Sequence, residues 1–383
     1  MPRFPVPCAL LPLFCTTPPQ AAVEHPSSWL GPTLDTLVPS LLAQHRVAGA
    51  AVAVVRGGTL DWSRGFGLAD AARGRQVGND TRFNIGSVSK PITAWGVTAL
   101  AMTHQIDLDA PVQRYLRRWQ LPPSAFDHGS VTVRRVLSHT AGLSVRGYHG
   151  VRVEGEAMPT LIESLDGYPG SDGALRVERE PGSEFVYSSG GYTMLQLLIE
   201  DVTGERFADY MRRSLFAPLR MDHTGYDWTP ELRAAVATPY NEEGRPWPHF
   251  VGPEQASGGV YTTVRDLARF VAAAMPGPEG QRPGRGILTA DAVAAMVAPA
   301  AATGGRHGLG YKQFAVPGGS HLVTYDGANE GWRAAFFMSA GTGDGLVILT
   351  NSDAGGRIVA PIVCAWASTT SIKMAALCAT VRR

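Results

Sequence analysis

The sequence predicts a mixed α/β (α+β) protein: an antiparallel sheet built from both chain ends, flanked by helices, with an inserted and mainly helical lobe. Two observations predict this class. Strand-like runs cluster toward the two ends of the chain, and helical patterns joined by Pro- and Gly-rich loops fill most of residues 106–257. A chain of 383 residues, 44% hydrophobic and 17% charged, can also bury a large core.

The first end of the chain reads as a helix, a hairpin and a second helix. A helical pattern covers Leu34–Gln44. Two strand-like runs, Ala50–Val55 and Thr59–Phe66, flank the pair Gly57-Gly58, which is typical of a tight hairpin turn. From Val88 to Met102, apolar residues recur at spacings of four and three, which predicts a helix with one buried face.

The remaining elements follow the same logic. An apolar stripe from Tyr192 to Val202, stopped by Gly204, predicts a helix in the middle of the chain. A helix is also expected from about Ile358. Between Gly308 and that helix the sequence predicts four short strands separated by glycine turns: Tyr311–Val316, His321–Tyr325, Trp332–Met338 and Gly345–Thr350. We therefore assign an α/β lobe to about 27–105 and 258–383, and the helical lobe to about 106–257.

Residues 1–26 form a signal-like or disordered segment. Met1-Pro2-Arg3 precedes the apolar stretch Phe4–Cys15, which prolines interrupt. If the segment is a secretion signal, the protein is periplasmic or secreted; if it is a disordered tail, the protein is cytoplasmic. No later run approaches the roughly 20 apolar residues of a membrane span, so we expect none.

Charge and cysteine content exclude several functional classes. The chain has 34 basic and 33 acidic residues, a formal net charge of +1, which argues against nucleic-acid binding. Its four cysteines, Cys8, Cys15, Cys364 and Cys378, do not read as a disulfide framework or as a zinc-type pair. We expect no metal and no cofactor. The sequence leaves the oligomeric state open.

The most informative segment surrounds Ser87 and Lys90. Both residues stand at the start of the predicted helix, three positions apart, so their side chains share nearly one face. Pro91 fits the first helical turn, where its missing N–H costs nothing. A serine hydroxyl needs a base beside it to become a nucleophile, and Lys90 can be that base. The main-chain N–H of Ser87 can in turn face a developing oxyanion.

The alternative is a surface helix that contains Ser-x-x-Lys by chance. Two facts favour the catalytic interpretation. The tetrapeptide opens a helix of the buried, amphipathic type. Only three lysines, Lys90, Lys312 and Lys373, occur among the 34 basic residues, so a lysine at this position is unusual for this chain.

The segment Ser87-Val88-Ser89-Lys90 resembles the first motif of the serine β-lactamase and penicillin-binding-protein superfamily. The resemblance runs from about residue 28 onward and is greatest to the class C-like branch. That branch includes D-alanyl-D-alanine carboxypeptidases, D-aminopeptidases and family VIII carboxylesterases. Other segments similar to that branch are Leu108–Val112, Leu137–Leu143, Pro218–Met221 and Ser257–Thr263.

The resemblance implies a second motif at Tyr187-Ser188-Ser189. Tyr187 would exchange a proton with Ser87, and later with the leaving group or the hydrolytic water. A free tyrosine titrates near pH 10, so this role needs a nearby positive charge, which Lys90 can supply. Ser189 replaces the usual substrate-binding asparagine with a shorter group that has fewer donors.

The resemblance places the third motif, usually Lys-Thr-Gly or His-x-Gly on an edge strand, at Tyr325-Asp326-Gly327. The N–H of Ala328 would complete the oxyanion hole with that of Ser87, and Gly327 would let the substrate backbone approach. Tyr325 would offer a substrate one hydrogen bond rather than a full charge. Arg333 could replace that charge if it reaches the cleft.

His139 lies in a segment similar to the family, where a structural histidine that holds a loop is the expected role.

Together these features predict a serine hydrolase that acts through an acyl-enzyme on a small-molecule ester, amide or peptide substrate. The missing third-motif lysine favours a carboxylesterase or peptidase-like activity. A true β-lactamase or D-alanyl-D-alanine carboxypeptidase is an alternative. A third hypothesis is a catalytically quiet homologue that binds peptidoglycan fragments or a protein partner, because Ser189 and Tyr325 both depart from the family pattern.

Overall fold

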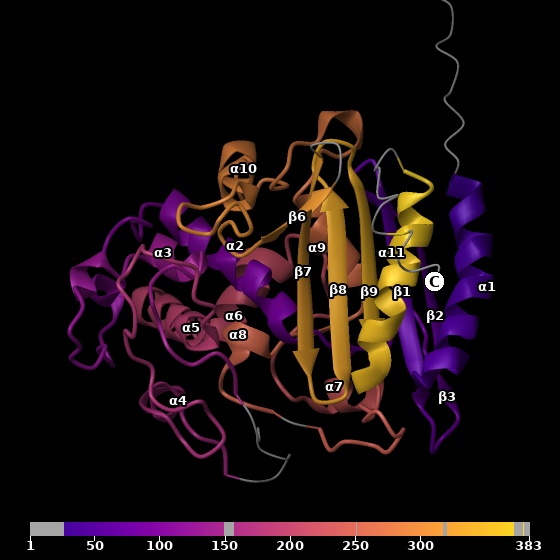
Figure 1. Ribbon diagram of the computed structural model, residues 1–383, viewed down its shortest axis with the longest axis horizontal. Helices are drawn as coiled ribbons and strands as arrows, with labels where there is room; N and C mark the ends of the chain where they lie inside the picture. The colour runs from indigo at the N-terminus through magenta and orange to yellow at the C-terminus, as the bar shows by residue number, and fades with distance from the viewer. Residues whose placement is uncertain (1–26, 149–156, 250, 317–319, 371–377, 379–383) are drawn as a thin grey trace, which may run out of the picture.

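The protein is built around a seven-stranded antiparallel sheet with the strand order β3-β2-β1-β9-β8-β7-β6 (Figure 1). The computed structural model describes residues 27–148, 157–249, 251–316, 320–370 and 378. Strand β1 pairs with β9 from Ala50↔Thr350 to Val55↔Gly345, so both ends of the chain share one sheet, as the sequence predicts. The strands of the sheet are β1 Gly49–Arg56, β2 Thr59–Asp70, β3 Arg75–Gln76, β6 Lys312–Val316, β7 Ser320–Asn329, β8 Trp332–Ser339 and β9 Asp344–Thr350.

Helices cover both faces of this sheet. On one face α1 and α11 pack side by side, and α9 covers the other (Figure 1). The helices are α1 Ser27–His45, α2 Ser89–Met102, α3 Val133–Leu137, α4 Leu161–Asp166, α5 Ser189–Thr203, α6 Phe207–Met211, α7 Pro230–Ala235, α8 Gln255–Gly258, α9 Val264–Ala273, α10 Ala290–Val297 and α11 Val359–Ala367. Within the described ranges, no helix combines the length and apolar character that crossing a bilayer requires.

Strand β1 is buried on both faces, which explains its uninterrupted apolar sequence. Because successive side chains point to opposite faces, Val52 and Val54 enter the core beneath α1 and α11. Ala51, Ala53 and Val55 enter the second core, which α2, α5 and α9 complete. The two-lobe division stays a prediction, although α3 to α7 all fall between residues 106 and 257.

Strand β7 is longer than the predicted run, which stopped at Tyr325. It continues through Asp326-Gly327, a pair that looks like a turn in the sequence, because Tyr325–Asn329 pairs with β8 down to Asn329↔Trp332. Its other neighbour, β6, pairs only with Ser320–Thr324. The edge of β7 from Tyr325 to Asn329 is therefore open on the side away from β8.

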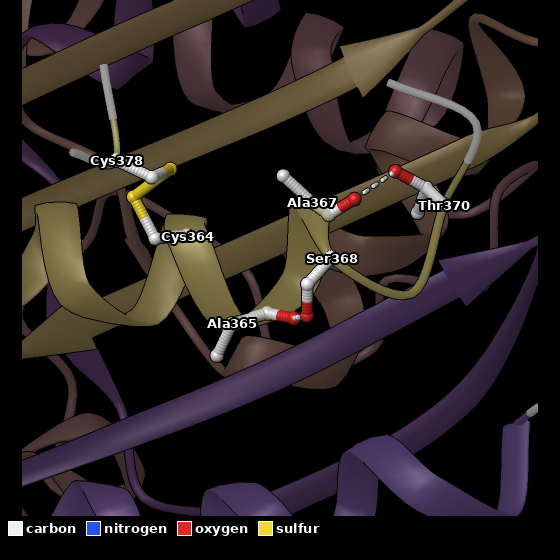
Figure 2. The surroundings of a disulfide bond; sticks show 6 residues. All are labelled: Cys364, Ala365, Ala367, Ser368, Thr370 and Cys378. Carbon is white, nitrogen blue, oxygen red and sulfur yellow. Dashed lines mark hydrogen bonds between the residues drawn. A yellow bond between two sulfur atoms is a disulfide. The ribbon is translucent and has the colours of Figure 1, made fainter. Parts of the chain in front are cut away.

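The end of α11 carries a disulfide bond that the sequence analysis did not anticipate. Cys364 is joined to Cys378 across 14 positions (Figure 2). Near them, the hydroxyls of Ser368 and Thr370 donate to the carbonyls of Ala365 and Ala367 and close the last helical turn. The cysteines were expected to form no disulfide framework, and the structure adds this single bond. Cys8 and Cys15 lie outside the described residues, as does the segment 1–26.

Candidate active site

The local fold places Ser87 in a short 3-10 helix, Gly86–Val88, that leads directly into α2. Gly86 has φ +50°, a conformation that favours glycine, and a Cβ at this position would lie 2.8 Å from the main-chain N of Ala328. The side chain of Asn84 accepts the N–H of Gly86 at 3.0 Å. These contacts hold the turn so that Ser87 is half-buried and lines a cleft.

Lys90 lies one turn beyond Ser87 and is completely buried. Its Nζ donates to Ser87 Oγ at 3.1 Å and to the carbonyl oxygen of Ser257 at 2.7 Å. Burial lowers the pKa of Lys90, because the charged ammonium has lost its water. The lysine is therefore closer to a neutral, proton-accepting state than an exposed lysine is.

Tyr187 reaches the same point from the residues just before α5. Its Oη lies 2.7 Å from Ser87 Oγ, and its ring lies 4.9 Å from Lys90 Nζ. Burial on its own raises the pKa of Tyr187, but the adjacent Lys90 ammonium and the hydroxyls of Ser87 and Ser189 together outweigh burial, and the net pKa is lowered. The structure thus brings together Ser87, Lys90 and Tyr187, the three residues that the sequence singled out.

This arrangement forms a chain of proton-carrying atoms, from Tyr187 Oη through Ser87 Oγ to Lys90 Nζ. A neutral Lys90 or an ionised Tyr187 is in direct reach of the Ser87 proton. The Lys90 ammonium favours ionisation of Tyr187, whereas an ionised Tyr187 favours the charged form of Lys90. The two groups titrate as a coupled pair rather than as independent sites.

The open edge of β7 forms the facing wall of the cleft. Asn329↔Trp332 closes a two-residue turn. Pairs in an antiparallel ladder alternate between hydrogen-bonded and non-hydrogen-bonded, so the N–H of the preceding Ala328 points away from β8. Gly327 packs so tightly on the Ser87 turn that a Cβ would lie 2.1 Å from Ile85 O and 2.9 Å from Ser87 N. Ser87 and Ala328 both line this cleft.

Ser189 borders the cleft as well, but its hydroxyl is already engaged. It donates to the main-chain carbonyl of Arg146 at 2.9 Å, and it contributes to lowering the pKa of Tyr187. This bond differs from the lysine- and substrate-binding role that the family asparagine implies. A serine side chain at this position is too short to span the same groups.

Tyr325 lies elsewhere than expected. Its side chain is fully buried, does not line the cleft, and its hydroxyl has no hydrogen-bond partner among the described residues. The cause is strand alternation: Tyr325 and Gly327 face the packed side of β7, whereas Asp326 and Ala328 are exposed. Burial raises the pKa of Tyr325 well above its ordinary value, so the residue is a neutral core tyrosine.

Arg333 does line the cleft, but its charge is already compensated. Its Nη1 lies 3.0 Å from Asp353 Oδ1 and also donates to the carbonyl oxygens of Asn329 and Trp332. It is therefore not a free replacement for the missing third-motif lysine.

His139 supports Tyr187 from behind. Its Nδ1 accepts the N–H of Ser188 at 3.1 Å, and its ring centroid lies 4.6 Å from that of Tyr187. Burial lowers the pKa of His139 well below its ordinary value, and His307 and Lys90 lower it further. A neutral, buried ring that binds a main-chain N–H matches the structural role expected for this histidine.

Sequence reasoning missed the polar contacts that hold the two walls together. Asn329 donates to the side chain of Asn84 at 2.7 Å and to the carbonyl of Gly258 at 3.2 Å. Ser89 donates to Gly86 and accepts the N–H of Val260. Asparagine and serine are common in turns, so nothing in the sequence distinguishes these residues from ordinary loop residues.

The cleft has a volume of about 380 Å³, which suits a small-molecule or peptide-sized ligand. Besides the residues above, its wall includes Arg146, Tyr148, Glu254 and Trp332. Over the described part of the chain, no three His, Cys, Asp or Glu side chains gather as metal ligands would.

Comparisons with known proteins find relatives of this chain in sequence and in fold. The model of the β-lactamase family matches residues 34–361. A penicillin-binding protein of Bacillus subtilis (strain 168) is 27% identical over 262 residues, which covers 62% of this chain and 54% of that protein. Esterase EstB of Burkholderia gladioli is 31% identical over 229 residues, covering 57% of this chain and 56% of the esterase. The chain thus matches about half the length of these relatives.

Among solved structures, a β-lactamase/D-alanine carboxypeptidase from Pseudomonas syringae has the same fold. The TM-score is 0.68 at 21% sequence identity, and the match covers 88% of this chain and 98% of that one.

Proposed function

The chain belongs to the β-lactamase family, and from this premise we propose that it is a serine hydrolase that cleaves esters or amides through a covalent acyl-enzyme. The observation that supports this most directly is the contact of Ser87 Oγ with both Tyr187 Oη, at 2.7 Å, and Lys90 Nζ, at 3.1 Å. A serine between two groups of lowered pKa has what a nucleophile needs.

The proposed reaction proceeds in two halves. Ser87 Oγ forms a bond to the substrate carbonyl carbon and gives its proton to the Lys90–Tyr187 pair. The carbonyl oxygen becomes an oxyanion, which the N–H groups of Ser87 and Ala328 stabilise. When the tetrahedral intermediate collapses, the bond to the leaving group breaks, and the pair returns the proton to that group. A water molecule then repeats the sequence on the acyl-enzyme and releases the acid.

We favour ester or peptide-like substrates without a required carboxylate. Neither Tyr325, which is buried, nor Arg333, which is paired with Asp353, offers a free charge on the β7–β8 wall. Esterase EstB is one of the relatives described above.

A second candidate is a β-lactamase or D-alanyl-D-alanine carboxypeptidase activity, whose substrates carry a carboxylate. Arg146 favours this candidate, because it brings a guanidinium to the lining of the cleft. Its Nη1 donates to the carbonyl of Tyr187 at 3.4 Å, which places the guanidinium on the helical side of the cleft.

A hydrolysis panel tests the proposal. The wild type and Ser87→Ala are compared on p-nitrophenyl acetate and butyrate, nitrocefin and D-alanyl-D-alanine peptides, and both are treated with a fluorophosphonate probe. Ser124→Ala, a serine exposed at the surface, is the matched control. We expect ester turnover and probe labelling in the wild type and the control, and loss of both in Ser87→Ala.

Labelling that persists in Ser87→Ala would rule out the mechanism. Wild-type protein that neither turns over nor is labelled would support a quiet binding homologue. Nitrocefin or dipeptide turnover faster than ester turnover would favour the second candidate.

A further inference from the structure

The third-motif position lacks a cation, yet a lysine from the neighbouring strand lies next to it. Lys312, on β6, places its Nζ 5.0 Å from the ring centroid of Tyr325. The strand register explains this, since Lys312 pairs with Thr324, the residue just before Tyr325. Lys312 is also one of only three lysines in a chain that uses arginine for almost all of its basic residues.

Lys312 forms an ion pair with Asp326, the middle residue of the third segment. The pair lies at the surface: the side chain of Lys312 is 34% exposed and that of Asp326 is 68% exposed. Beneath it lie Tyr325 and His307, whose rings contact each other, and His307 contacts His139. The ammonium of Lys312 therefore lies against a series of rings in contact, Tyr325, His307 and His139, the last of which packs against Tyr187.

We propose that Lys312 and Asp326 are positioning residues for the reaction: from the neighbouring strand, Lys312 places a partly compensated positive charge against Tyr325, Asp326 moderates that charge, and the pair adjusts the electrostatic environment of Lys90 and Tyr187 across the buried rings that separate them. This inference deepens the proposed function and rests on it for its catalytic consequence. It gives the Lys312–Asp326 pair a role that a surface ion pair of ordinary, marginal value would not have.

The charges that face Lys90 act in opposite directions. Burial has the largest effect on the pKa of Lys90 and lowers it, whereas Tyr187 raises this pKa. The positive charge of Lys312 lowers the pKa further, and the negative charge of Asp326 raises it by a smaller amount. Three further titratable neighbours are neutral near pH 7. Burial lowers the pKa of both His139 and His307. Burial raises the pKa of Tyr192, whose ring centroid lies 5.7 Å from Lys90 Nζ. The two members of the pair should therefore affect Lys90 with opposite signs.

A direct titration tests this without requiring turnover. Because the chain has only three lysines, ¹³C-lysine labelling yields three side-chain signals, and Lys90→Ala assigns the one of interest. The pH titration of that signal is followed in the wild type, Lys312→Met, Asp326→Asn and the conservative variant Lys312→Arg. Asp109→Asn, which breaks the exposed ion pair of Asp109 with Arg134, is the matched control.

We expect the midpoint of the Lys90 signal to move up by roughly 0.3–0.8 pH unit in Lys312→Met, because a like charge is gone. In Asp326→Asn it should move down by a similar or smaller amount. Lys312→Arg and Asp109→Asn should keep the wild-type midpoint, and salt should reduce both shifts. Shifts of the same sign in Lys312→Met and Asp326→Asn, or no shift in either, would overturn the inference.

The pH profile of kcat/KM adds the catalytic consequence. Its acidic limb reports the group that must be deprotonated in the free enzyme, so it should move in the same directions as the midpoint. If the midpoints shift but no substrate is hydrolysed, the electrostatic role stands and the proposed function fails. If hydrolysis depends on Ser87 but the midpoints and the acidic limb do not move, only the role of the pair fails.

Discussion

The side-chain oxygens of Ser87 and Tyr187 lie 2.7 Å apart although 100 positions separate them in the chain. Ser87 lies in the short 3-10 helix just before α2, whereas Tyr187 lies just before α5. Contacts of α2 and α5 with each other, and of both with α8, keep these two points in place. The contact between Ser87 and Tyr187 therefore depends on packing between helices, whereas one local helical turn places Lys90 beside Ser87.

Tyr187→Phe isolates the contribution of the phenol oxygen. The variant keeps the ring that contacts Lys90 and His139 but loses the Oη that reaches Ser87. We expect kcat on p-nitrophenyl butyrate to fall about 10²–10⁴-fold with little change in KM, because proton transfer rather than binding is lost. Tyr115→Phe, outside the cleft, should leave both constants unchanged. A kcat within threefold of the wild type would contradict the role of the phenol.

Gly327→Ala tests the tight contact between β7 and the Ser87 turn. The new methyl group would lie 2.1 Å from the carbonyl oxygen of Ile85, so the backbone must move. We expect the free energy of unfolding to fall by about 1–3 kcal/mol, and activity to fall as the N–H groups of Ser87 and Ala328 separate. Gly78→Ala, where a Cβ meets open space, is the control. Chemical denaturation and ester kinetics give both values, and a fully active, stable Gly327→Ala would contradict this packing.

The buried histidine behind the site predicts a dependence of stability on pH. Burial lowers the pKa of His307 to about 4, from an ordinary value of 6.5. The side chain of His307 therefore binds a proton more readily in the unfolded chain than in the folded protein. The stabilisation is complete above about pH 6.5 and is lost as the pH falls toward 4, so this residue should cost about 2 kcal/mol between pH 7 and pH 5.

Urea unfolding of the wild type and His307→Asn at pH 7 and pH 5 gives the free energy of unfolding at each pH. The contribution of His307 is the loss between pH 7 and pH 5 in the wild type minus the loss in the variant. His104→Asn, an exposed histidine, serves as the reference. Equal pH dependence in the wild type and His307→Asn would show that His307 does not carry the effect.

Much of the fold could be predicted from the sequence because periodicity survives in long elements. The helix from Val88 to Met102 and the stop at Gly204 both match the structure, in which Gly204 takes φ +72° at the end of α5. The hairpin glycines Gly57 and Gly58 likewise have positive φ. These sequence patterns reflect local backbone preferences, and the tertiary structure keeps the same local conformations.

The third segment shows where such prediction ends. Whether Tyr325 faces the cleft or the core depends on strand register, and a shift of one residue exchanges the two faces. The pairing of Arg333 with Asp353 and the bond between Cys364 and Cys378 are likewise contacts made only after folding. Residue types alone do not distinguish a free arginine from a neutralised one.

The incomplete pairing of β6 with β7 has a consequence for solubility as well as for chemistry. Five consecutive residues, 325–329, present their outer main-chain groups without a neighbouring strand. Exposed strand edges invite association with other chains, and proteins tolerate them when they are short or carry charge. Here the exposed length is brief, Asp326 stands within it, and Asn329 ties its end to the opposite wall. The open stretch of β7 is therefore short, charged and fixed at one end, and these features limit association at a strand edge.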